Sequence, residues 1–472
     1  THRPQPGWAE QDPEDWWRAV IRVIHAVNKQ LQTQGLKVEN IGLTGQMHGP
    51  VILGRDGELL GPCMLWMDTR AETQASALTS SIGEKRLLTL TGNPAVAAFP
   101  AAKLLWLKRH RPEVHRAIRM VLISKDYIGF RLTGQYATDP SDASGTLLFD
   151  LHAGRWSEVL VETVGLPVAA LPTVAPATAR LGDLTEAAAQ QTGLRAGTPV
   201  FVGAGDLATA AVGNGLVRPD QVAITLGTAG QLLFHLKRWS EALPGRFYLF
   251  ASAIPGAYLG LGTIPTGGAA LHWLARLLTG EVHPDAHHLE ELVKEAEHVP
   301  PGARGLVFLP YLAGTGTPHL DYQARGAFIG LTEAHGPAEL VRALMEGVAY
   351  ALQDSLQLLQ AEGLQPQEIR IAGGGMKNPL WTRIQADIYG CPLRPVHILD
   401  ASPLGACLLA AVACGRYRNL AEACEAAVKV GPPIAPEAPT AEYYRTGYVV
   451  FQQLYDRLGE IFPALKRWEG QR

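Results

Sequence analysis

The chain has 472 residues, enough for two or three domains of ordinary size. Its 41 lysines and arginines nearly balance its 44 aspartates and glutamates, which leaves a net charge of −3. That balance argues against a surface built to bind nucleic acid, whose phosphates require concentrated positive charge. A hydrophobic content of 47% excludes a disordered chain. Because the sequence shows no apolar segment of membrane-spanning length and no leader-like start, we expect a cytoplasmic protein without a membrane partner.

The first part of the chain is typical of short strands alternating with helices. Asp12 as N-cap and Pro13 at the first helical position predict a helix start, and apolar residues then recur at helical spacing. Strands are predicted at 41–44 and 121–123, and a hairpin is predicted at 51–60. Each predicted strand lies close to a glycine-rich or polar turn.

A second alternation of this kind continues to the end of the chain. A strand at 200–202 ends in a Gly-Ala-Gly-Asp loop, and 222–234 has the pattern of a hairpin. A long amphipathic helix is predicted around 340–352. The strand predicted at 369–372 ends in three glycines, and Pro379 then begins a helix. Strands that end in glycine-rich loops before helices indicate an α/β fold whose ligands bind at the carboxyl ends of the strands.

Asp206 is the first candidate for chemistry. It follows an apolar strand, and the glycines beside it leave room for a ligand to approach. An ionised carboxylate at this position could take a proton from a substrate hydroxyl, as phosphoryl transfer requires. The alternative is that Asp206 merely caps the short helix that follows it.

The turn Gly227-Thr228 between two apolar strands is the second candidate. Such a turn can direct backbone N–H groups and a hydroxyl toward phosphate oxygens, although an ordinary hairpin turn has the same pattern. Gly268, after Thr266, is a weaker site of the same kind.

The glycines 373–375, followed by Asn378, are the third candidate. Three glycines at a strand end let the backbone pack flat against a planar base, and a helix N-terminus follows. The spacing matches neither the Walker A motif nor the dinucleotide motif, so those two nucleotide-binding classes are disfavoured.

Met47 and His48 form the fourth candidate, in a loop between glycines at a strand end. There the imidazole could hydrogen-bond a polyol, although a lone loop histidine is more often structural. The other histidines are scattered without the spacing of a metal site, so we assign no protein-bound transition metal.

Taken together, these segments resemble the FGGY family of carbohydrate kinases, and within it the branch that acts on D-xylulose. The resemblance covers nearly the whole chain, and its segments occur in the family's order: 6–17, 45–49, 65–70, 100–107, 203–206, 326–331, 342–347, 373–379, 385–387 and 405–406. Ala98 departs from the leading position of the first family signature.

The resemblance implies an α/β fold of two ribonuclease-H-like domains of the actin and hexokinase type, with a cleft between them. Residues 1–218 would form the sugar-binding domain and 219–472 the nucleotide-binding domain. The implied reaction is the ATP-dependent phosphorylation of a ketopentose, D-xylulose to D-xylulose 5-phosphate, with ATP and Mg²⁺ required. The implied partners are the sugar and ATP, and the resemblance is also compatible with a homodimer.

The resemblance also assigns a role to each candidate residue. Asp206 would be the general base, and Met47 and His48 would hold the ketose. The nucleotide would lie near the remaining candidates, with its phosphates by Gly227, Thr228 and Gly268 and its adenosine by Gly374, Gly375 and Asn378.

Two features depart from the family pattern. Leu207 stands where the D-xylulose branch has asparagine after the catalytic aspartate, so another sugar or polyol is an alternative substrate. The family also opens with a hairpin that carries an Asp-x-Gly-Thr phosphate loop, which we expect to lie upstream of Thr1. Absence of that loop from these residues favours a second alternative, a non-catalytic relative that binds sugar or nucleotide.

Overall fold

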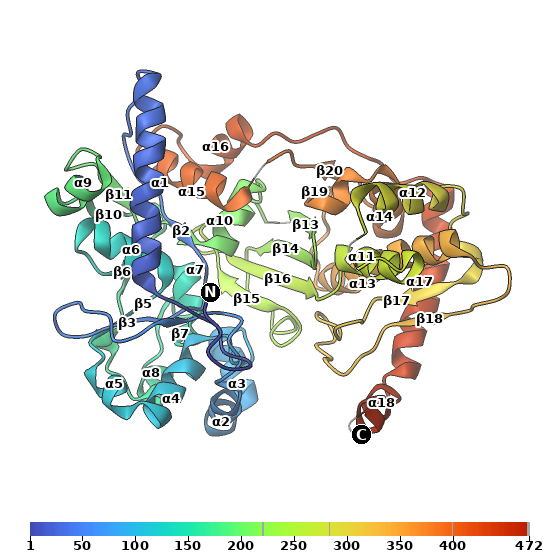
Figure 1. Ribbon diagram of the computed structural model, residues 1–472, viewed down its shortest axis with the longest axis horizontal. Helices are drawn as coiled ribbons and strands as arrows, with labels where there is room; N and C mark the ends of the chain where they lie inside the picture. The colour runs from blue at the N-terminus through green and yellow to red at the C-terminus, as the bar shows by residue number, and fades with distance from the viewer. Residues whose placement is uncertain (220, 283, 399, 470–472) are drawn as a thin grey trace. The chain divides into compact units, whose positions relative to one another are not determined.

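The computed structural model describes residues 1–219, 221–282, 284–398 and 400–469, which form two compact units (Figure 1). Each unit is built from three separate stretches of chain. The first unit comprises Thr1–Val217, Leu236–Leu259 and Leu399–Val428. The second comprises Arg218–His235, Gly260–Ile398 and Lys429–Arg472.

The first unit is rich in short helices, among which α10 and α15 pack closely although they are far apart in sequence (Figure 1). Its helices are α1 (Pro13–Thr33), α2 (Glu72–Ile82), α3 (Glu84–Thr91), α4 (Pro100–His110), α5 (Pro112–Ala117), α6 (Ser124–Thr133), α7 (Pro140–Ser144), α8 (Glu158–Val164), η1 (Val168–Ala170), α9 (Glu186–Thr192), α10 (Asp206–Gly213), α15 (Ala401–Ala413) and α16 (Leu420–Ala427). The close packing of α10 on α15 depends on Gly405, where an added Cβ would lie 1.9 Å from the Thr209 carbonyl oxygen.

The strands of the first unit are short, and those described, except β15, pair two by two. They are β1 (Glu10–Gln11), β2 (Thr44–Gly45), β3 (Val51–Leu53), β4 (Cys63–Met64), β5 (Met120–Leu122), β6 (Ala137–Thr138), β7 (Phe149–Asp150), β8 (Arg155–Trp156), β9 (Thr173–Val174), β10 (Arg180–Asp183), β11 (Pro199–Phe201), β12 (Ala204–Gly205) and β15 (Tyr248–Ala251). One pair positions the site: β12 runs parallel to β2, with Ala204 opposite Thr44 and Gly205 opposite Gly45.

The second unit is organised around a sheet in which β16, β14, β13, β19 and β20 lie side by side in that order. Its strands are β13 (Val222–Leu226), β14 (Gly230–Leu236), β16 (Tyr258–Ile264), β17 (Val307–Leu309), β18 (Ala327–Ile329), β19 (Ile369–Ala372) and β20 (Leu393–Pro395). The strands β13 and β14 form an antiparallel hairpin, whereas β19 runs parallel to β13. The carboxyl ends of β13 and β19 therefore lie at the same edge of the sheet.

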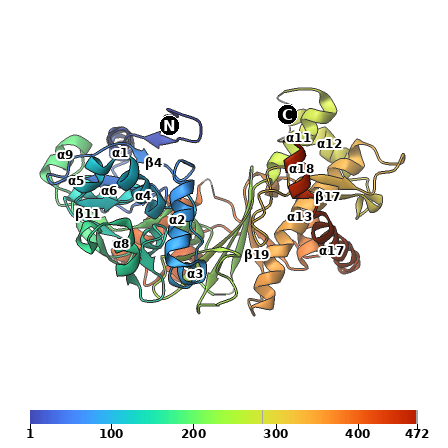
Figure 2. The same ribbon diagram turned by 90° about the horizontal axis from the view of Figure 1, so that it is seen from below.

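The helices of the second unit include a long buried helix, α13, which packs against α14, α12 and α11 and lies beside α17 (Figure 2). They are α11 (Gly268–Thr279), α12 (Ala286–Ala296), η2 (Ala303–Gly305), α13 (Pro337–Ala361), η3 (Gly374–Lys377), α14 (Pro379–Tyr389), α17 (Ala438–Leu458) and α18 (Phe462–Glu469). Most residues of α13 between Val341 and Leu359 are buried, because other elements cover more than one of its faces.

The local predictions are largely confirmed. Asp12 caps α1 by accepting from the Glu14 amide, and Asn378 caps α14 by accepting from the Trp381 amide. The predicted hairpin at 51–60 forms, with Leu53 bridged to Leu59 and the Leu60 amide donating to the Ile52 carbonyl at 3.0 Å, and its strand β3 also pairs with β5. The helix α1 forms as predicted, and its apolar stripe is covered unevenly, since Trp17 is buried whereas Val23 is 60% and Val27 47% accessible.

Among the described residues, no helix combines the length and the apolar character needed to cross a bilayer.

Candidate active site

Asp206 and the loop of Met47 and His48 lie side by side in the first unit. The parallel pairing of β12 with β2 places Gly205 opposite Gly45, so the segments that leave the two strands start from neighbouring positions. Gly205 has no side chain to separate them, and an added Cβ there would lie 2.8 Å from Cγ of Met47. The predicted base and the predicted sugar loop are therefore brought together.

Asp206 is the first residue of α10 and is partly buried. Burial raises the pKa of its carboxyl from 3.8 to about 6, while the amide N–H groups of Leu207 and of Asp206 itself act in the opposite direction. Its backbone carbonyl accepts a hydrogen bond from the Ser402 hydroxyl at 3.0 Å. The carboxylate is thus ionised at neutral pH and basic enough to accept a proton from a substrate hydroxyl.

His48 is held in a strained backbone conformation with φ of 67°. Its Nδ1 lies 2.7 Å from the carbonyl oxygen of Gly145, and its ring packs edge-on against Phe99. Burial is the main cause that lowers the pKa of His48 to about 4. The ring is neutral near pH 7, and because a carbonyl oxygen can only accept, Nδ1 carries the hydrogen. The other ring nitrogen, Nε2, therefore carries no hydrogen and can act as a hydrogen-bond acceptor, not as a donor.

Lys103 supports this loop, although no functional role was predicted for it from the sequence. Its side chain is buried in α4, and Nζ donates to the carbonyl oxygens of His48 at 2.8 Å, Met64 at 3.1 Å and Leu65 at 2.8 Å. Burial lowers its pKa to about 7. A lysine inside the apolar run of 100–107 is the signal that could have identified it, because a buried amine requires specific partners.

The Gly227-Thr228 turn joins β13 to β14 in the second unit, where Thr228 is exposed. The Gly227 amide donates to Ala229, and the Gly268 amide donates to the Gly227 carbonyl at 2.7 Å. Those two N–H groups are therefore occupied within the turn. Gly268 brings the start of α11 against the turn, since an added Cβ would lie 2.7 Å from the Gly227 oxygen.

The glycines that follow β19 lie at the same edge of this sheet. Gly373 has φ of 89°, and an added Cβ would lie 2.6 Å from the Leu226 carbonyl oxygen. Gly374 is exposed, and no atom lies within 4 Å of the position of an added Cβ. Asn378 uses its Oδ1 to accept from the Trp381 amide at 3.0 Å. The six predicted nucleotide contacts thus gather at one end of β13 and β19.

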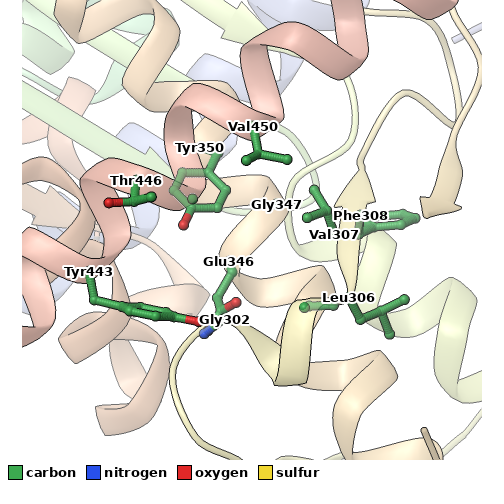
Figure 3. Close-up of a pocket in the computed structure, with 13 residues that line it drawn as sticks. Gly302, Leu306, Val307, Phe308, Glu346, Gly347, Tyr350, Tyr443, Thr446 and Val450 are labelled. Atoms are coloured by element: carbon green, nitrogen blue, oxygen red, sulfur yellow. The ribbon is translucent and has the colours of Figure 1, made fainter. Parts of the chain in front are cut away.

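A cavity of about 250 Å³ lies elsewhere in the second unit (Figure 3). The figure shows Tyr350 and Tyr443 on one side and Leu306 and Phe308 on the other, with Glu346 between them. Oε1 of Glu346 accepts hydrogen bonds from Gly302, Arg342 and Tyr444. None of the predicted site residues lines this cavity.

Within the described parts of the chain, no three or more His, Cys, Asp and Glu side chains are grouped so that they could hold a metal ion.

The chain matches proteins of known type over almost its entire length. Residues 1–213 match the N-terminal domain of the FGGY family of carbohydrate kinases, and residues 222–414 match the C-terminal domain. "Xylulose kinase" of Escherichia coli (strain K12) is 35% identical over 457 residues, which are 97% of this chain and 92% of that protein.

Solved structures agree with this match. The crystal structure of xylulose kinase from Rhodospirillum rubrum has a TM-score of 0.92 at 33% identity, covering 98% of this chain and 93% of that chain. The crystal structure of gluconate kinase from Lactobacillus acidophilus has a TM-score of 0.91 at 27% identity, covering 98% and 92%.

The fold and these matches define a carbohydrate kinase built from two α/β domains of the actin and hexokinase type. The chain belongs to the FGGY family of carbohydrate kinases. The predicted family, fold class and enzyme class are thereby confirmed, whereas the roles of individual residues stay predictions.

Proposed function

We propose that this kinase transfers the γ-phosphoryl group of ATP to a hydroxyl of D-xylulose, giving D-xylulose 5-phosphate and ADP. The observation that carries the proposal is the near full-length similarity to proteins named xylulose kinase, at 35% identity for the relative from Escherichia coli. The adjacency of Asp206 to the Met47–His48 loop supports it, because it joins a basic carboxylate to a polar sugar loop.

In the proposed reaction, Asp206 accepts the proton of the attacking sugar hydroxyl while that oxygen bonds to the γ-phosphorus. The bond between the γ-phosphorus and the β,γ-bridging oxygen breaks, and ADP leaves. His48 accepts a hydrogen bond from another hydroxyl through Nε2, and the packing of Met47 against Gly205 orients the carbon chain of the sugar. Catalysis then consists mainly of positioning and proton acceptance, as is usual for phosphoryl transfer.

The nucleotide would bind at the shared ends of β13 and β19. Thr228 would face the phosphates beside Gly227 and Gly268, and the open backbone at Gly374 would face the adenosine, next to Asn378 and to Gly375, which packs against Leu226. ATP would enter as its Mg²⁺ complex, in which phosphate oxygens and water supply most ligands of the metal. This fits a chain whose described side chains form no dedicated metal cage.

A panel of sugars tests the proposal. ATP-dependent ADP release should have the highest kcat/KM for D-xylulose, compared with D-gluconate and glycerol, and phosphorus NMR should identify a 5-phosphate product. A higher kcat/KM for D-gluconate would favour the second candidate, which the similarity to gluconate kinase supports. The variant Leu207→Asn tests the departure noted in the sequence, since an added amide could reach a sugar hydroxyl.

A further inference from the structure

A buried hydroxyl holds the amide of Gly205, the residue immediately before Asp206. Oγ of Ser141 accepts a hydrogen bond from the Gly205 amide at 3.0 Å, and the same hydroxyl donates to Oδ2 of Asp139. Ser141 is 1% accessible and Asp139 is fully buried. Because the serine hydroxyl has a single hydrogen, the bond to Asp139 fixes its orientation and aims a lone pair at Gly205.

Asp139 is in turn held by a buried lysine. Nζ of Lys125 lies 2.6 Å from Oδ1 of Asp126, 3.0 Å from Oδ1 of Asp139 and 3.2 Å from Oδ2 of Asp142. All four side chains are essentially inaccessible. One ammonium group facing three carboxyl groups is costly to bury, so stability alone is a weak reason for this cluster.

Lys125 and Asp126 lie at the start of α6, and this end of the helix also holds the sugar loop. The hydroxyl of Ser124, next to Lys125, donates to the carbonyl oxygen of Gln46. Gly45 packs directly on this helix, where an added Cβ would lie 3.2 Å from both N and Cβ of Lys125. The loop before Asp206 and the loop before Met47 are therefore both fixed to one buried anchor, the Lys125 cluster, defined by Lys125, Asp126, Asp139 and Asp142.

We propose that Ser141 is a positioning residue for the phosphoryl transfer: its hydroxyl, oriented by Asp139 and the Lys125 cluster, fixes the Ala204–Gly205 peptide, which leads into Asp206, and thereby aims the Asp206 carboxylate. This inference rests on the proposed function, in which Asp206 is the base. The Ala204–Gly205 peptide matters because it leads directly into the two amides that stabilise the Asp206 carboxylate, that of Asp206 itself and that of Leu207. We expect a displacement of this peptide to shift the start of α10 and to weaken both contacts.

Several titratable groups lie on the described elements that pack near this turn. They are the four members of the Lys125 cluster on α6 and at the start of α7, His48 and Lys103 at the sugar loop, and Asp400 at the N-cap of α15. None of these groups is among the causes that shift the pKa of Asp206. His48 is neutral, and burial together with the two amides governs the pKa of Asp206. Loss of the amide contacts must therefore raise this pKa.

The test compares two buried serines of α7. Ser141→Ala removes the acceptor for Gly205, and Ser144→Ala removes the matching acceptor for the Ala251 amide, also at 3.0 Å. We expect Ser141→Ala to lower kcat by about tenfold to a hundredfold, with the KM for ATP within twofold. In the pH profile of kcat/KM for the sugar, the midpoint of the acid limb should rise by at least half a pH unit in Ser141→Ala and stay near pH 6 in Ser144→Ala. Ser141→Thr, which retains the hydroxyl, should return this midpoint to its wild-type value.

Two further results distinguish a positioning role from a purely structural one. If Ser141→Ala does not fold, Asp139→Asn is measured instead, and a limb that stays at the wild-type pH in that variant overturns the proposal. An equal fall in kcat for both alanine variants without a shift of the limb also overturns it, because that marks a purely structural role. Failure of the proposed function is distinguishable, since then the unmodified kinase would not phosphorylate the sugar or Asp206→Asn would turn over normally.

Discussion

Nζ of Lys103 lies 2.8 Å from the carbonyl oxygen of His48, a residue whose own backbone is left-handed with φ of 67°. A left-handed conformation costs a residue other than glycine about 1–2 kcal/mol, so other contacts must offset it. Lys103 also donates to Met64 and Leu65, and its three N–H groups thus match three carbonyl oxygens. We infer that Lys103 maintains the shape of the proposed sugar loop.

Replacing this lysine should affect sugar binding selectively. In Lys103→Met, three buried carbonyls lose their donor, and we expect the free energy of unfolding to fall by about 2–4 kcal/mol. The KM for D-xylulose should rise at least tenfold, while the KM for ATP stays within twofold. Denaturant titration and steady-state kinetics measure both quantities. Lys108→Met, at an exposed position of the same helix, is the control. An unchanged KM for the sugar in folded Lys103→Met would refute the inferred role.

The neutrality of His48 has a consequence for stability. Its folded pKa is about 4, below the ordinary 6.5, so its stabilising contribution is present above pH 6.5 and is lost as the pH falls toward 4. In His48→Gln this loss cannot occur. We therefore expect the melting temperature of the wild type to fall relative to that of the variant between pH 7 and pH 4.5. A constant difference across that range would show that His48 does not titrate as described.

Asp206 should show the opposite dependence. The pKa of Asp206 in the folded protein is about 6, above the ordinary 3.8. Its contribution to the free energy of unfolding is therefore fully present below pH 3.8 and is lost as the pH rises through 6. Replacement by asparagine removes this loss. With a discount for its partial exposure, we expect Asp206→Asn to be more stable by about 1 kcal/mol at pH 8 and to melt about 2 °C higher. The gain should vanish near pH 4, and Asp183→Asn, at an exposed site, should show no comparable gain.

Substitutions at the glycines after β19 can distinguish an effect on ATP binding from an effect on the stability of the fold. Gly374→Ala adds a methyl group where no protein atom lies within 4 Å, so the melting temperature should change by less than about 2 °C. If adenosine lies there, the KM for ATP should rise at least fivefold. Gly373→Ala is the structural comparison, because its φ of 89° and the nearby Leu226 carbonyl should cause a clear loss of stability. An unchanged KM for ATP in Gly374→Ala would remove Gly374 from the nucleotide site.

Local signals in the sequence predicted the fold well where neighbours along the chain decide the structure. The caps at Asp12 and Asn378 and the hairpin of β13 and β14 depend on residues a few positions apart. The strand ends before Asp206 and before the glycines at 373–375 were recognisable for the same reason. Parallel pairing then brought Asp206 beside Met47, which a strand pattern alone does not specify.

The remaining site features depend on contacts between distant residues. Ser141 reaches Gly205 across 64 positions, and Lys103 reaches His48 across 55. The partners of Ser141 and Lys103 are backbone amides and carbonyls, which almost any residue supplies. No side-chain pattern in the sequence therefore predicts these contacts. In α1, periodicity predicts a helix with an apolar face, but it does not show whether another element covers that face. Val23 and Val27 on this face are exposed.

The most direct measurement of the central claim is the turnover of Asp206→Asn with D-xylulose and Mg-ATP, together with calorimetric binding of D-xylulose. Asparagine retains the size of the side chain but cannot accept the proton of the sugar hydroxyl. We predict that kcat falls by about 10³-fold while the Kd for D-xylulose changes by less than about fivefold. A kcat within tenfold of the wild type would contradict the account, because the base would then have to be another group.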